Sequence, residues 1–191
     1  MGEKRPGQRF SEAELNEPVM RRIVLQPCSS SRLSGRFRQL IGKPGADGHA
    51  DGGFAIEQVT TAKALEEYLD AYVAGWDFPE KDHAQFKSNV RPWLEQAGWS
   101  LYLARVNGQP AAAATLYVLD DVGYLADSAT DPSFRRRGVH VALLRRRMRD
   151  AGVSGADLVF SGAEPFSSSH RNMERVGMRL QFTRAKWTLA S

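Results

Sequence analysis

The chain has very little of the residues that build disulfides or metal sites: one cysteine, Cys28, and four histidines among 191 residues. A single thiol cannot form an intramolecular disulfide, and the histidines show no zinc-ligand spacing. No apolar run approaches the ~20 residues that span a bilayer, and the first residues lack a signal-peptide core. The sequence therefore predicts no metal, no membrane association and a cytoplasmic location.

The chain also has only a small excess of positive charge. Its 26 basic and 22 acidic residues give a net charge of +4. The arginines gather in two groups, at 135–137 and 145–149. The second group fits the solvated face of a helix, whereas the first can attract a polyanion. No helix-turn-helix or RNA-binding signature accompanies them, so a basic module for nucleic acid or another partner is only a third alternative.

The sequence divides by composition into two parts. Residues 1–53 are rich in Gly, Ser, Arg and Pro and end in a Gly-rich run at 45–53, which is typical of a linker. We expect 1–53 to be a tail or linker, either flexible or used for docking. Regular apolar periodicity begins at Phe54, so 54–191 is predicted to form one domain.

Within this domain the periodicities predict a definite order of elements. A strand and two helices precede three strands, and the second of these begins after Asn107-Gly108, a pair that favours a type I′ hairpin turn. A helix, a strand, another helix and two final strands follow; the predicted ranges are 54–59, 61–75, 86–97, 101–106, 111–119, 122–130, a helix ending at 152, 157–161, 168–176, 178–183 and 185–189. This order predicts an α/β (α+β) domain with a mixed, mostly antiparallel sheet and helices on both faces.

The most informative motif joins the strand at 122–130 to the following helix. Arg135-Arg136-Arg137-Gly138-Val139-His140 forms a basic turn at the helix N-terminus. Free N–H groups of the first helical turn and the helix dipole attract anions there, and glycine permits a close approach of the backbone. A pyrophosphate group would suit this position.

The turn resembles the coenzyme A pyrophosphate loop of the GNAT superfamily of acyl-CoA-dependent N-acetyltransferases, whose pattern is Arg/Gln-x-x-Gly-x-Gly/Ala. Arg135 and Gly138 agree with the pattern and His140 departs from it; the order of elements over 54–191 is similar as well. The resemblance implies transfer of an acetyl group from acetyl-CoA to a primary amine. It also implies a strand 127–130 that diverges from 157–161 and a cofactor site formed by Ala129, Thr130, Arg135, Arg136, Arg137, Gly138, Val139 and His140.

The catalytic groups are less well defined by the sequence. Tyr124, Asp127 and Glu164 are the candidate general bases, and Phe78 is a candidate wall of the acceptor site. Met173 stands where relatives of this superfamily carry a general-acid tyrosine. Methionine cannot donate a proton, so the leaving thiolate would take its proton from solvent or from a serine at 168–169, or need none.

A second hypothesis follows from the missing tyrosine. The chain would then be an acyl-CoA-binding sensor or scaffold with weak or no turnover. The sequence does not identify the acceptor amine, and a homodimer formed through the terminal strands is left open.

Overall fold

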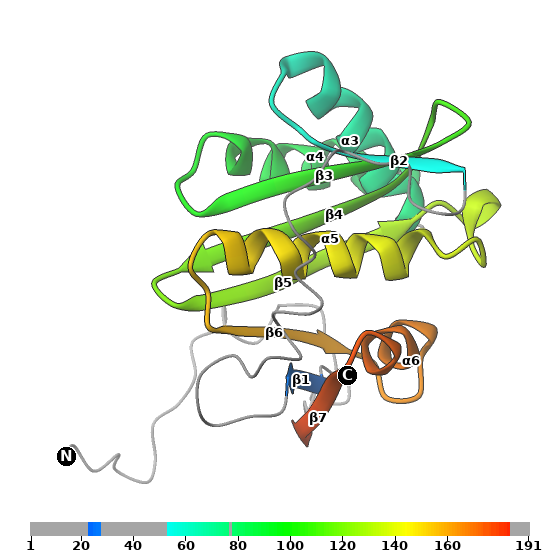
Figure 1. Ribbon diagram of the computed structural model, residues 1–191. Coiled ribbons are helices and arrows are strands. Elements are labelled where there is room, and N and C mark those ends of the chain that lie inside the picture. Colours follow the sequence, from blue (N-terminus) through cyan, green and yellow to red (C-terminus); the bar gives the residue numbers. More distant parts are fainter. Residues whose placement is uncertain (1–22, 28–52, 77, 184–191) are drawn as a thin grey trace, which may run out of the picture.

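The computed structural model describes residues 23–27, 53–76 and 78–183 (Figure 1). Its strands are β1 (Ile23–Pro27), β2 (Phe54–Gln58), β3 (Trp99–Val106), β4 (Gln109–Leu119), β5 (Val122–Thr130), β6 (Leu158–Ala163) and β7 (Met178–Thr183). Its α-helices are α3 (Ala62–Trp76), α4 (His83–Val90), α5 (Val139–Val153) and α6 (Ser168–Arg175), with short 3-10 turns at Glu80–Asp82, Arg91–Leu94 and Pro132–Phe134. None of these helices is long and apolar enough to cross a membrane.

The described strands form one mixed sheet in the order β2-β3-β4-β5-β6-β1-β7. β3, β4 and β5 form an antiparallel meander, and β6 then pairs parallel to β5 after the chain crosses over through α5. At the β3–β4 turn, Asn107 has φ 51° and Gly108 has φ 81°, as a type I′ turn requires. The predicted mixed, mostly antiparallel sheet is confirmed.

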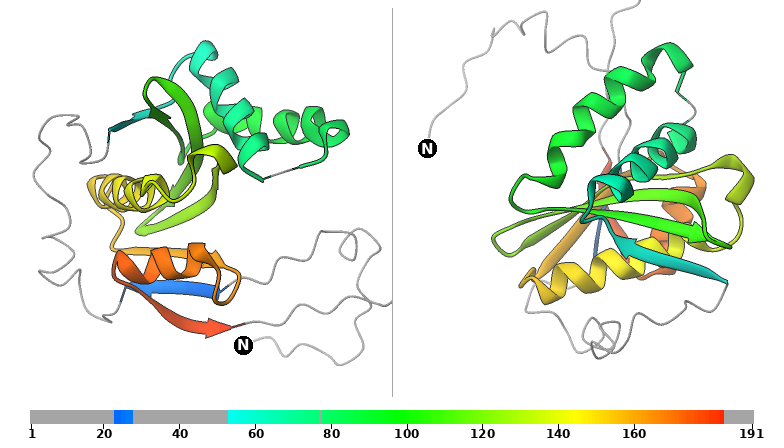
Figure 2. Two further views of the ribbon diagram at one scale, coloured as in Figure 1. Left: turned by 90° about the vertical axis from the view of Figure 1, so that its right-hand side faces the viewer. Right: turned by 90° about the horizontal axis from the view of Figure 1, so that it is seen from above.

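The two faces of the sheet are covered by different helices, as Figure 2 shows. Side chains of successive strand residues point to opposite faces, and β3 displays this alternation. Leu101 and Leu103 pack into the apolar cluster that contains α3, whereas Tyr102 and Ala104 belong to the cluster that contains α5. Helices on both faces, as the periodicities predicted, are therefore confirmed.

Strand β1 is the main difference from the predicted organisation. The segment Ile23–Pro27 lies between β6 and β7 and pairs antiparallel with both, although it belongs to the predicted tail at 1–53. Its run of three apolar residues is short, and the basic and Ser-rich sequence around it obscured the signal. Residues 1–22 and 28–52, like the predicted strand at 185–189, lie outside the described residues, and their organisation stays a prediction.

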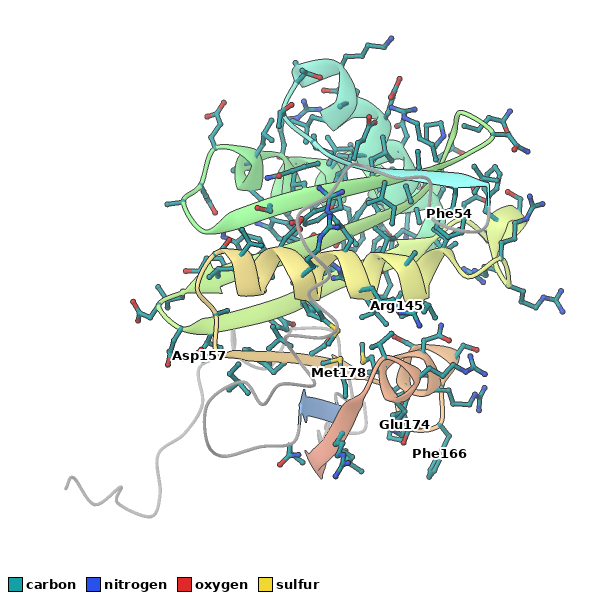
Figure 3. All side chains as sticks on the ribbon, viewed as in Figure 1. Phe54, Arg145, Asp157, Phe166, Glu174 and Met178 are labelled. Atoms are coloured by element: carbon teal, nitrogen blue, oxygen red, sulfur yellow. The ribbon has the colours of Figure 1, made fainter. Side chains whose placement is uncertain are left out.

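The second arginine group does not form a uniformly solvated face. Arg145 is exposed (Figure 3), but Arg147 is only 1% exposed. Its Nη1 donates to the carbonyls of Thr115 (2.8 Å) and Ala126 (3.3 Å), and its Nε donates to that of Leu143 (3.2 Å). The β4–β5 register shifts at this point, so the guanidinium binds carbonyls at a β-bulge.

Burial lowers the pKa of Arg147 to about 10, so the side chain stays charged at neutral pH. A buried charge must be compensated by hydrogen bonds, and the carbonyls at the bulge supply them. The prediction for residue 147 was wrong because helical spacing alone cannot tell an arginine that faces solvent from one that faces the sheet.

Candidate functional site

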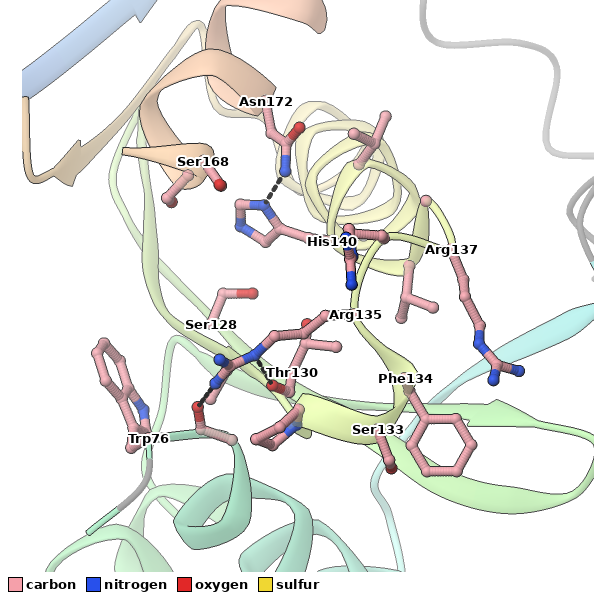
Figure 4. A pocket seen from close by; sticks show the side chains of 18 of the residues that line it. Trp76, Ser128, Thr130, Ser133, Phe134, Arg135, Arg137, His140, Ser168 and Asn172 are labelled. Carbon is pink, nitrogen blue, oxygen red and sulfur yellow. Dashed lines mark hydrogen bonds between the residues drawn. The ribbon is translucent and has the colours of Figure 1, made fainter. Parts of the chain in front are cut away.

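A cavity of about 870 Å³ lies where the end of β5 meets the N-terminus of α5 (Figure 4). The C-terminal end of α3 and one face of α6 complete its wall. The lining residues are Gly75, Trp76, Ser128, Ala129, Thr130, Pro132, Ser133, Phe134, Arg135, Arg136, Arg137, Gly138, Val139, His140, Val141, Ser168, Ser169, Asn172 and Arg175. All eight predicted cofactor-site residues are in this lining, so the structure brings them together.

The basic turn is shaped by its backbone. Asp131 accepts from the Ser133 N–H (2.8 Å) and starts the 3-10 turn. Arg136 (φ 63°) and Gly138 (φ 83°) are both left-handed. The Ala142 N–H donates to the Gly138 carbonyl (3.1 Å). The N–H groups at 139–141 therefore precede the first helical hydrogen bond and are available to an anion.

Arg135 has a positioning role within this turn. Its Nε donates to the Thr130 carbonyl (3.1 Å) and its Nη2 to the Gly75 carbonyl (3.2 Å). At Gly75 the helix lies so close to β5 that an added Cβ would be 2.7 Å from Ala129. The side chain of Arg135 thus joins the turn to α3 and β5, while Arg136 and Arg137 are exposed.

Strands β5 and β6 separate beside the cavity. Their parallel pairing extends only from Val122 to Tyr124, and the Ser161 hydroxyl then donates to the Leu125 carbonyl (2.7 Å). The β5–β6 pairing of the described strands does not extend to Ser128, Ala129 or Thr130. The predicted divergence of the two strands is confirmed, and it exposes one edge of β5 to the cavity.

Two buried polar atoms of the lining have no hydrogen-bond partner in the described structure: the Ser128 hydroxyl and the Trp76 indole Nε1. Buried polar groups are normally paired, because an unpaired one costs about 1–3 kcal/mol. Both atoms come from different elements and lie in the wall of one cavity. This is the pattern expected of a cavity that receives a polar ligand.

The predicted acceptor residue Phe78 lies elsewhere. Its ring stacks on Phe86, with centroids 3.5 Å apart, and packs into the apolar cluster of α3. It is absent from the cavity lining, where Trp76 is found instead. The Phe78 ring also stacks beside Trp76, with centroids 6.2 Å apart, and its role as a wall of the acceptor site stays a prediction.

None of the three candidate bases lines the cavity directly. Asp127, next to Ser128 on β5, is partly buried and accepts from the Tyr72 hydroxyl (3.2 Å). Tyr124 stacks on Phe160 with centroids 4.7 Å apart. Glu164 is exposed beyond the end of β6. Among the three, Asp127 is the one adjacent in sequence to a lining residue, Ser128.

Helix α6 contributes residues that the sequence analysis missed. Asn172 and Arg175 line the cavity together with the serines at 168–169. Their i, i+1, i+4, i+7 spacing places them on one helical face, and this polar stripe was the available signal. Met173, in contrast, is 4% exposed and packs in the core.

The family follows from comparison with known proteins. Residues 35–166, more than two thirds of the chain, match the acetyltransferase (GNAT) domain. This chain belongs to the GNAT acetyltransferase family. No curated protein matches the sequence at a significant level.

Solved GNAT structures share the fold at low sequence identity. The aminoglycoside acetyltransferase meta-AAC0020 from an uncultured soil metagenomic sample, in complex with sisomicin, has a TM-score of 0.56 and 18% identity, covering 73% of this chain and 99% of that one. The aminoglycoside N-acetyltransferase AAC(6')-Iy in complex with CoA has a TM-score of 0.57 and 18% identity over 72% and 94%. The GCN5-related N-acetyltransferase from Kribbella flavida has a TM-score of 0.56 and 21% identity over 86% and 56%.

Proposed function

We propose that this GNAT protein transfers an acetyl group from acetyl-CoA to a primary amine. The observation that carries the proposal is the anion-binding turn at the N-terminus of α5, which opens directly onto the cavity beside the separated strands. Acetyl-CoA supplies an acyl group activated as a thioester. The proposal gives each part of the cavity wall a role toward this substrate.

The wall fits the cofactor in two respects. The N–H groups at 139–141 and the exposed Arg136 and Arg137 can bind phosphate oxygens. A Cβ added to Gly138 would meet no protein atom within 4 Å, so the backbone there is open to a bulky anion. Along β5, the main chain at Ala129 and Thr130 offers hydrogen bonds to an extended, amide-containing arm.

We propose Asp127 as the general base. An attacking amine must lose a proton as its nitrogen bonds to the acetyl carbon and the C–S bond breaks. Asp127 lies one residue before the lining and is held by Tyr72. It can receive that proton directly or through a water molecule.

The leaving thiol need not receive its proton from a dedicated acid. Met173 is buried in the core and cannot donate. The pKa of a free thiol is about 8.5, so a thiolate is a tolerable leaving group near neutral pH. Solvent or the Ser168 hydroxyl, which lines the cavity, can supply the proton.

The experiment is a thiol-release assay with acetyl-CoA and a panel of primary amines. Because two of the structurally similar proteins are aminoglycoside acetyltransferases, the panel should include aminoglycosides beside small amines, amino acids and peptide N-termini. Titration calorimetry with CoA measures binding independently. Turnover of any amine supports the proposal, whereas absence of CoA binding at millimolar concentration would overturn it.

The second candidate function is a CoA-binding sensor or scaffold. The observation that favours it is Met173 in place of the expected tyrosine. Tight CoA binding without thiol release across the whole panel, and without acetylated product by mass spectrometry, would support this alternative over the enzyme.

A further inference from the structure

His140 occupies the last defined position of the pyrophosphate-loop pattern, where the family favours glycine or alanine. Its side chain is partly buried and lines the cavity. The imidazole Nδ1 is 3.0 Å from the Asn172 side-chain nitrogen, which belongs to α6. Figure 4 shows the ring turned from α5 toward α6, where it forms part of the wall.

The hydrogen bonds define which ring nitrogen carries the proton. Arg175 Nη1 donates to the Asn172 Oδ1 (2.8 Å), and a guanidinium can only donate. The Asn172 amide therefore presents its NH₂ group to His140, so Nδ1 must accept. A neutral imidazole with Nδ1 as acceptor carries its hydrogen on Nε2.

The charged group that acts on this ring is Arg147, which lies on the same helix. Burial, reinforced by Arg147, lowers the pKa of His140 to about 4. The carboxylate of Glu174 on α6 lies nearest a different histidine, with its Oε1 3.7 Å from the Nε2 of His170. His140 is thus neutral at physiological pH and presents one N–H donor to the cavity.

We propose that the Nε2–H of His140 donates a hydrogen bond to an amide carbonyl of the pantetheine arm of CoA. This inference rests on the proposed function, because it assumes that CoA occupies the cavity. The free edge of the ring faces the space between Ser128 and Ser168 in Figure 4, on the side where β5 and β6 separate. Phosphate oxygens have other partners, namely the helix N–H groups and the exposed Arg136 and Arg137.

His140, at a position where the family favours a small residue, would then recognise the pantetheine arm of the cofactor. Its orientation is set by Asn172 and Arg175, which touch the ring or its partner and act as positioning residues. A preorganised hydrogen-bond donor loses little conformational entropy when the ligand binds. The unpaired Ser128 hydroxyl lies on the same side and can hydrogen-bond to the same arm.

The test compares CoA with 3′-phosphoadenosine 5′-diphosphate, which keeps the phosphates and lacks the arm. By calorimetry, His140→Ala should weaken CoA binding roughly 3- to 10-fold, as expected for one neutral hydrogen bond, and leave binding of the nucleotide unchanged. His140→Gln, which retains an amide donor, should recover most of the CoA affinity. His83→Ala, a histidine outside the lining, is the matched control.

The outcomes separate this inference from the proposed function. If the wild type binds neither ligand, the proposed function fails. If the wild type binds CoA, two results would overturn only the role of His140 in binding the pantetheine arm. One is an unchanged CoA affinity of His140→Ala, and the other is an equal loss of its affinity for CoA and for the nucleotide. Nitrogen-15 NMR of the wild-type ring supplies a test that needs no variant: a proton on Nδ1 would contradict the proposal, whereas an Nε2–H signal that shifts with CoA and not with the nucleotide supports it.

Discussion

Helix α5 meets the sheet in two contrasting ways. In its middle, Arg147 is buried and its guanidinium donates to the backbone carbonyls of Thr115, Ala126 and Leu143. At its N-terminal end, the N–H groups at 139–141, the Ser128 hydroxyl and the Trp76 indole lie around a cavity, and the last two have no partner in the described structure. The polar groups in the buried middle of α5 are therefore hydrogen-bonded within the protein, whereas two of those around the cavity are left for a ligand to bind.

The difference also explains how the site is held in place. The bulge bound by Arg147 includes Ala126 and Asp127 on β5 and lies directly before Ser128. Arg135 joins the turn to the Gly75 and Thr130 carbonyls. Paired arginines thus surround the unpaired region on two sides and fix the direction of its donors, which is the preorganisation that a binding site requires.

The largest expected effect comes from breaking the paired region. Arg147→Ala should lower the free energy of unfolding by about 3 kcal/mol or more, because two buried carbonyls lose their donor and a cavity is left. Urea denaturation measures it. Arg145→Ala, exposed on the same helix, should stay within about 0.5 kcal/mol of the wild type, and equal losses for both variants would contradict the assigned role of Arg147.

Asp127→Asn tests the boundary between the two regions. The amide keeps the size of the side chain and can still accept from Tyr72, so stability and CoA affinity should change little. If Asp127 is the base, kcat with the best amine should fall by about 10²-fold or more. A variant with unchanged kcat would show that the carboxylate has only a structural role, and Tyr72→Phe serves as the control for loss of the hydrogen bond alone.

Gly138→Ala, at the N-terminal end of α5, is compared with the same substitution at Gly155. Gly138 (φ 83°) and Gly155 (φ 92°) share the left-handed conformation, and an added Cβ meets no atom within 4 Å at either position. Both alanine variants should therefore lose about 1 kcal/mol of stability. Only Gly138→Ala places a methyl group at the turn, so we expect it alone to weaken CoA binding, by roughly tenfold or more in calorimetry. Parallel affinity losses would mean that backbone strain, not ligand contact, is responsible.

These regions also differ in how far the sequence predicted them. The meander, the Asn107-Gly108 turn and the cofactor turn were predictable because local periodicity and turn chemistry determine them. The burial of Arg147 and the direction of the His140 ring depend on contacts with elements distant in sequence, namely β4 and α6. Trp76 was predicted as an anchor of its loop, and its place in the cavity wall is likewise decided by tertiary packing.

Strand β1 illustrates a further limit. Three apolar residues in a polar segment carry little periodicity, yet β6 and β7 each offer this strand a row of backbone hydrogen-bonding groups. Pairing on both sides can order a strand whose own propensity is weak. The domain limit at 53–54 was drawn from composition, which does not register such pairing.

The smallest effect is expected at Met173, which is buried in the core and which the sequence analysis placed at the position of the family's general-acid tyrosine. Met173→Tyr should change kcat by less than about tenfold, well under the 10²–10⁴ typical of a positioned acid, because a thiolate with a pKa near 8.5 leaves without assistance. Rates across pH should rise as the acceptor amine loses its proton, with the same shape for both proteins. Met173→Phe, which adds a ring without a hydroxyl, separates crowding of the core from proton donation. A hundredfold gain confined to the tyrosine variant would show that a missing acid limits this enzyme, and it would favour a chain selected for binding CoA over one selected for turnover.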